Sequence, residues 1–147
     1  MPEVLVVSDS EKVRNEVVSA IVDPSTIVRE LTRGKEVRDS VGDEPPDLVV
    51  LDQQIGKMGG MATCMDLRLE ESGGRLDHVP ILLLLDRRAD VFLARRAGAD
   101  GWVVKPLDPI RLGRAIHALL AGGIYHDEAH RPPTVSPVPS RTADSVR

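Results

Sequence analysis

Residues that suit phosphoryl chemistry follow directly on several short apolar runs of this sequence. In chain order they are Ser8, Asp9, Asp52, Asp86 and Lys105. A carboxylate can attack a phosphoryl donor when a divalent cation offsets the charge, and Mg²⁺ prefers one or two carboxylates with waters and phosphate oxygens. A lysine opposite supplies a fixed positive charge to the phosphoryl oxygens. If these side chains meet, the sequence predicts a phosphate-handling site.

The apolar runs themselves are typical of strands in a parallel sheet. Residues 4–7, 48–51, 81–85 and 102–104 are apolar at every position, which suits strands covered on both faces. Residues 26–31 form a weaker run, which we expect at an edge of the sheet.

Stretches with helical spacing separate these runs, at residues 10–22, 35–41, 60–72, 88–97 and 108–121. Strand and helix patterns therefore alternate five times, which predicts an α/β fold with a doubly wound parallel sheet and right-handed crossovers. Ligands bind beyond the carboxyl ends of such strands. We therefore expect the residues named above to converge there, on Asp52.

Composition limits the remaining options. The net charge of −4 and the aromatic fraction of 2% argue against nucleic-acid binding, which needs a basic surface and stacking platforms. The lone Cys64 fits a reducing compartment, and no apolar run approaches the roughly 20 residues that span a bilayer. We expect a cytoplasmic protein with no membrane partner.

Residues 1–123 form one domain in this interpretation, without an output domain, and the Pro- and Ser-rich residues 124–147 form a disordered tail.

The segments VLVVSDS, PDLVVLDQQIGKMGG, VPILLLLD and AGADGWVVKPLD resemble the successive strand ends of the response-regulator receiver family. The resemblance covers residues 3–121. It implies a flavodoxin-like, five-stranded sheet of order 2-1-3-4-5 and a role in two-component signalling. It also implies that a partner histidine kinase phosphorylates Asp52, so the expected partner is a histidine kinase or another signalling protein.

The same resemblance assigns the other site residues. Asp9, Asp52 and the backbone carbonyl of Gln54 would bind Mg²⁺, and Lys105 would contact the phosphoryl group. The bond between Lys105 and Pro106 is the candidate cis peptide. Trp102 matches the family's rotating aromatic switch, although plain packing explains a tryptophan there equally well.

Three residues depart from the family's pattern. Ser8 replaces the first acid of the Mg²⁺-binding pair, so we expect weak cation binding. Leu85 replaces the Ser or Thr that links the phosphoryl group to the aromatic switch, and leucine donates no hydrogen bond. Asp86 stands where the family has a small residue. It either partly replaces the missing acid at the cation or repels incoming phosphate.

Two other functions stay open. A degenerate receiver could act without phosphorylation, as a module that binds a protein or a small molecule at the same site. An aspartate-based phosphohydrolase needs a second acid two residues after its nucleophile, where this chain has Gln54, so we do not expect an enzyme beyond self-phosphotransfer onto Asp52. The mixed charges of residues 87–121 suit either a solvated surface or a homodimer, which we expect there.

Overall fold

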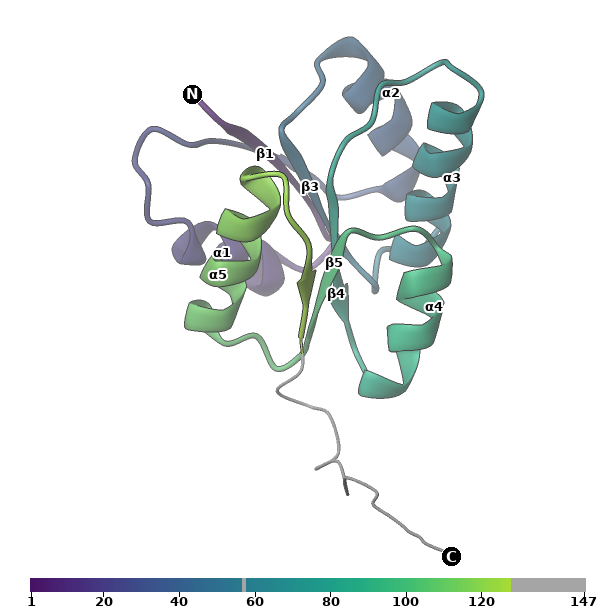
Figure 1. The fold of residues 1–147 in the computed structure, drawn as a ribbon. Helices are drawn as coiled ribbons and strands as arrows, with labels where there is room; N and C mark the ends of the chain where they lie inside the picture. The colour runs from purple at the N-terminus through teal and green to yellow at the C-terminus, as the bar shows by residue number, and fades with distance from the viewer. Residues whose placement is uncertain (57, 128–147) are drawn as a thin grey trace, which may run out of the picture.

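The computed structural model describes residues 1–56 and 58–127 and shows a three-layer α/β fold (Figure 1). Within these residues the sheet has six parallel strands in the order β2-β1-β3-β4-β5-β6. Their bounds are β1 Glu3–Val7, β2 Ile27–Leu31, β3 Leu48–Asp52, β4 Ile81–Leu85, β5 Gly101–Val104 and β6 Tyr125–His126. The predicted doubly wound sheet and its 2-1-3-4-5 order are confirmed, with a sixth strand added beside β5.

Helices cover both faces of the sheet. Helices α1 and α5 lie on one face, and α2, α3 and α4 lie on the other (Figure 1). Their bounds are α1 Glu11–Ala20, α2 Val37–Asp43, α3 Gly60–Ser72, α4 Val91–Arg96 and α5 Pro109–Leu120, with 3₁₀ turns at Gly34–Glu36 and Arg88–Asp90. All five predicted helices are therefore present; α3 has the predicted bounds and the other four have shifted ends.

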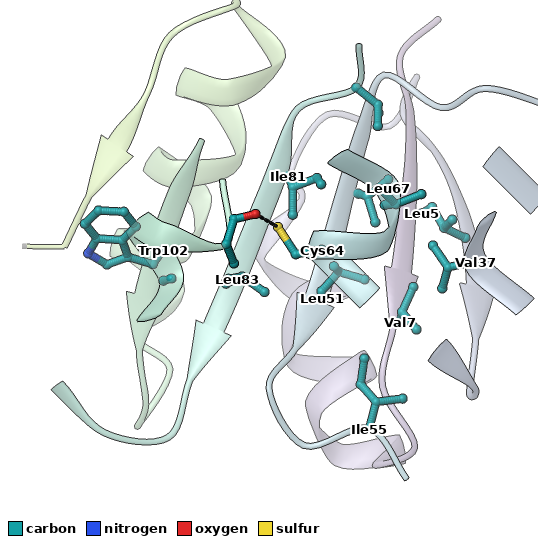
Figure 2. Packing of buried hydrophobic residues seen from close by; sticks show 14 of the residues in the cluster. Leu5, Val7, Val37, Leu51, Ile55, Cys64, Leu67, Ile81, Leu83 and Trp102 are labelled. Atoms are coloured by element: carbon teal, nitrogen blue, oxygen red, sulfur yellow. Dashed lines mark hydrogen bonds between the residues drawn. The ribbon is translucent and has the colours of Figure 1, made fainter. Parts of the chain in front are cut away.

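Two apolar clusters pack against the two faces of the sheet. Successive strand residues point to opposite faces, so Leu5 and Val7 join the cluster beneath α2 to α4, whereas Val4 and Val6 join the cluster beneath α1 and α5. Figure 2 shows the first cluster, which Leu51, Leu67 and Leu83 help to fill. The continuous apolar runs of the sequence reflect this burial on both sides.

The starts of two helices lie beside the carboxyl ends of the strands. Ser10 caps α1 by accepting a hydrogen bond from the Val13 N–H at 3.3 Å, and Asp108 caps α5 by accepting one from the Ile110 N–H at 2.8 Å. Because Ser10 is the α1 cap, the carboxylate of the neighbouring Asp9 is available for another contact.

The structure differs from the sequence-based expectation at the end of the domain. Residues 124–127 were expected to begin a disordered tail, but Tyr125 and His126 form β6 alongside β5. The chain turns back after α5 at Gly122, whose positive φ of 87° suits glycine. A two-residue strand carries too little sequence to show a pattern. The remainder of the expected tail, residues 128–147, lies outside the described residues.

Candidate functional site

Four polar side chains come together at the carboxyl end of the sheet. Asp52 ends β3, and Ser8, Asp86 and Lys105 follow β1, β4 and β5. Hydrogen bonds join them into one network, in which Ser8 and Lys105 both contact Asp52. The parallel arrangement of the strands thus produces the convergence that the sequence predicted around Asp52.

Asp52 lies at the centre of this network and is only 1% exposed. Its Oδ2 accepts a hydrogen bond from Ser8 Oγ at 2.7 Å. Its Oδ1 accepts hydrogen bonds from Lys105 Nζ at 2.6 Å and from the backbone N–H of Gln54 at 3.0 Å. A buried carboxylate is costly unless it is paired and hydrogen-bonded, and these three donors meet that requirement.

Ser8 is fully buried and uses its hydroxyl in both directions. The hydroxyl donates to Asp52 and accepts a hydrogen bond from the Ser10 N–H at 3.0 Å, as a single hydroxyl group can. A carboxylate in this place would face Asp52 with a like charge. The serine instead contributes a neutral hydrogen bond to the site.

Lys105 is shared between two carboxylates. Its Nζ lies 2.6 Å from Asp52 Oδ1 and 2.9 Å from Asp86 Oδ1. Burial acts to lower the pKa of Lys105, but the hydrogen bonds to Asp52 and Asp86 outweigh it and the pKa is raised. The ammonium is therefore firmly charged at neutral pH. The bond between Lys105 and Pro106 is cis in this structure.

Two glutamines brace the loops around the site. Gln54 Nε2 donates to Asp86 Oδ2 at 2.6 Å, so both carboxylate oxygens of Asp86 are bonded. Gln53 accepts from the Asp86 N–H at 2.8 Å and donates to Asp90 Oδ2 at 2.9 Å. That second bond, with help from Arg87, lowers the pKa of Asp90. Sequence reasoning missed these side-chain roles, although the two glutamines directly after Asp52 were a visible signal.

Asp9 contacts the loop that follows β3. Its Oδ2 accepts a hydrogen bond from the backbone N–H of Gly56 at 2.8 Å. Within the described part of the chain, Asp9 forms no hydrogen bond to Asp52 or Lys105. Asp9 was expected to meet Asp52 and Lys105. It contacts the loop after β3 instead of either side chain.

Comparison with known proteins gives this site a family. The model of the response regulator receiver domain matches residues 4–117. The chain belongs to the response regulator receiver family. The matched range contains every polar residue of the site, from Ser8 to Lys105.

Individual relatives agree with this assignment. The nitrate/nitrite response regulator NarL of Escherichia coli is 29% identical over 122 residues, which cover 83% of this chain and 55% of NarL. The transcriptional regulatory protein AfsQ1 of Streptomyces coelicolor is 30% identical over 125 residues, which cover 84% of this chain and 53% of AfsQ1. The chain thus spans about half the length of these curated relatives.

Two solved structures of response regulators are similar to this chain over most of their own length. The chemotaxis response regulator CheY4 of Vibrio cholerae has a TM-score of 0.70 and 25% identity, covering 81% of this chain and 98% of CheY4. A LuxR-family two-component response regulator from Aurantimonas has a TM-score of 0.72 and 28% identity, covering 84% of this chain and 87% of that protein.

The donor set of this receiver domain fits a small hard cation with few protein ligands. The residues expected at the cation, Asp9, Asp52 and the Gln54 carbonyl, would supply only oxygen ligands, which is the set that Mg²⁺ takes when waters complete its shell. The described residues contain no cluster of three or more His, Cys, Asp or Glu side chains able to hold a metal. Because Ser8 is neutral, the expected set would give Mg²⁺ two carboxylates.

The two residues that the resemblance assigns to the switch, Leu85 and Trp102, are both buried. Leu85 is 0% exposed in the core, and Trp102 is 2% exposed. The ring of Trp102 stacks on the ring of His126, with centroids 4.1 Å apart and planes 5° from parallel. The guanidinium carbon of Arg95 lies 5.3 Å from the Trp102 ring centroid, within cation–π range. Sequence reasoning did not identify His126 as a partner of Trp102.

No helix among the described residues is long and apolar enough to cross a membrane.

Proposed function

We propose that this receiver domain is a phosphoacceptor in two-component signalling and that Asp52 takes the phosphoryl group. The contact between Lys105 Nζ and Asp52 Oδ1, at 2.6 Å, carries the proposal. A buried carboxylate beside a fixed cation at the end of a strand suits transfer of a dianionic group, because the cation meets the charge that arrives.

The step is an in-line displacement. An oxygen of the Asp52 carboxylate forms a bond to phosphorus, and the bond from phosphorus to the donor's nitrogen or oxygen breaks, with its electron pair leaving on the donor. The product is an acyl phosphate on Asp52. Lys105 then contacts the phosphoryl oxygens, while the Gln54 N–H and the Ser8 hydroxyl remain as hydrogen-bond donors nearby.

We also propose that Asp9, Asp52 and the Gln54 carbonyl would bind Mg²⁺ weakly. When bound, Mg²⁺ offsets negative charge between the carboxylate and the incoming phosphoryl group. Ser8 contributes no charge to this set, and Asp86 is engaged by Lys105 and Gln54. These contacts leave both expected roles of Asp86 open, at the cation or against incoming phosphate. Its contacts suit a third role, as a competitor for Lys105.

A partner histidine kinase is the donor that the family assignment supports, and contacts with other proteins are the expected output. Self-association through residues 87–121 remains a proposal. Strand β6 lies against β5 within that surface, so any such dimer must form over β6 or after it has left.

A second function has specific support. Both oxygens of Asp52 are already hydrogen-bonded, and Leu85 offers no hydroxyl to a phosphoryl group. These features suit a module that binds a partner without phosphorylation.

Incubation with acetyl phosphate and Mg²⁺ followed by intact-mass measurement separates the two functions. Phosphorylation predicts an adduct of one phosphoryl group in the parent and in the exposed-site control Asp77→Asn, and none in Asp52→Asn. If the parent gains no mass while it retains its fold, the phosphoacceptor function is wrong and the binding module remains.

A further inference from the structure

The outer edge of β5 is closed by the chain's own residues 124–127. Without them β5 would be the last strand of the sheet, and an edge strand offers its unpaired N–H and C=O groups to any extended chain. One side of β5 is satisfied by β4, where the Lys105 N–H donates to the Leu85 carbonyl at 2.8 Å. On the other side, the Val104 N–H donates to Asp127 Oδ2 at 3.0 Å.

Strand β6 makes three kinds of contact along this edge. Gly101 and Trp102 pair with Tyr125 and His126 in a parallel ladder, and the Tyr125 N–H donates to the Asp100 carbonyl at 3.3 Å. The His126 ring covers the Trp102 ring at 4.1 Å. Asp127, only 7% exposed, caps Val104. The outer edge of β5 is thus covered by the backbone of β6, by the His126 ring and by the Asp127 carboxylate.

Gly101 lies where β6 approaches β5 too closely for a residue with a side chain. A Cβ atom at this position would lie 2.7 Å from the backbone oxygen of Tyr125 and 3.2 Å from Leu119 Cδ1. Any larger residue would therefore push against the backbone of β6. The close approach of a second strand is built into β5 as well as into the segment that pairs with it.

The closure is also small enough to open. Among the described residues, two ladder pairs join β6 to the sheet, and Gly122 and Gly123 precede it. Elements with few buried contacts open locally at a much lower free energy than the whole domain.

We propose that residues 124–127 are an intramolecular cap that keeps two copies of this chain from pairing through their β5 edges. Two identical edges can pair about a two-fold axis, because each copy then presents the same strand to the other. Gly101 permits the close backbone approach that such pairing needs. The cap depends on neither Mg²⁺ nor phosphorylation of Asp52.

The test uses the full chain with His126→Ala and Asp127→Ala combined. Trp102 is the single tryptophan, so its fluorescence reports on the cap directly. The double variant should show red-shifted emission, several-fold stronger quenching by acrylamide and at least tenfold faster exchange of the Val104 amide. Its weight-average mass in sedimentation should rise with concentration. The matched control Ile124→Ala, at a 65% exposed position of the same segment, should behave like the parent.

A second variant changes β5 instead of β6. Gly101→Ala leaves every side chain of β6 intact and should shift the emission, the acrylamide quenching and the Val104 amide exchange in the same directions, with far-UV circular dichroism reporting that the sheet is retained. A buried Trp102 and a protected Val104 amide in the double variant would overturn the cap. In the double variant, an exposed edge that leaves the chain monomeric at every concentration would overturn the proposal as well.

Discussion

The ammonium of Lys105 lies 2.9 Å from a carboxylate oxygen of Asp86, so the lysine that faces Asp52 has a second acidic partner. Gln54 holds the other oxygen of Asp86 in place at 2.6 Å. A phosphoryl group on Asp52 would have to draw Lys105 away from Asp86 or share it. We therefore expect the Asp86 contact to affect how readily the site accepts negative charge.

Replacing Asp86 with Asn should accelerate phosphorylation of Asp52. The substitution removes one negative charge beside the incoming dianion, and a water-screened pair at about 4 Å is worth ~1 kcal/mol, or roughly fivefold in rate. Phosphorylation rates with acetyl phosphate, followed by intact mass, measure the effect. Asp77→Asn removes the same charge at an exposed position and should leave the rate unchanged. A slower reaction in Asp86→Asn would mean that Asp86 serves the cation instead.

Replacing Ser8 with Asp should lower the stability of the fold and raise its affinity for Mg²⁺. The new carboxylate would face the buried Asp52 without the present 2.7 Å hydrogen bond, and losing a buried hydrogen bond costs roughly 1–3 kcal/mol. Added Mg²⁺ should restore the melting temperature of Ser8→Asp far more than that of the parent. Thermal unfolding with and without Mg²⁺ measures both effects. Equal responses of the two proteins to Mg²⁺ would rule out a cation site beside residue 8.

The raised pKa of Lys105 predicts a loss of stability in alkaline solution. A folded-state pKa above the unfolded value means that the ammonium stabilises the fold fully below about pH 10.4 and that this stabilisation is lost as pH rises through the folded pKa. The parent should therefore lose more stability than Lys105→Met on going from neutral pH to strongly alkaline pH. Urea unfolding across that range tests the difference, and parallel curves would contradict it.

Cys64 should resist alkylation as long as the domain is folded. It is buried in the cluster of Figure 2, its thiol donates to the Ala97 carbonyl at 3.3 Å, and burial raises its pKa to about 12. Only the thiolate reacts, so iodoacetamide at neutral pH should modify native Cys64 on the order of a thousandfold more slowly than a free thiol. Mass spectrometry in buffer and in denaturant measures both rates. Rapid labelling of the native chain would mean that α3 opens readily.

Much of the fold could be predicted because burial leaves a strong pattern. The runs containing Val6, Val50 and Leu83 are apolar at successive positions since helices cover both faces of their strands. The alternation of these strand patterns with helical stretches then predicted a parallel sheet with helices on both faces. β6 escaped prediction because Tyr125 and His126 are held by tertiary contacts, not by any local pattern.

The site was predictable as a set of positions but not as a set of contacts. The position of Asp52 followed from the ends of the parallel strands. The sequence could not show that Ser10, rather than Asp9, caps α1, or that Gln54 reaches across to Asp86. Side-chain partners across loops depend on distances that spacing along the chain does not encode.

The most direct test of the phosphoacceptor site locates the modified residue. The chain would be treated with acetyl phosphate and Mg²⁺, reduced with borohydride to trap any acyl phosphate, digested and mapped by tandem mass spectrometry. Reduction at Asp52 alone, absent from untreated chain, is the result that the buried Asp52–Lys105 pair predicts. Reduction at another carboxylate, or at none in a chain that remains folded, would contradict it.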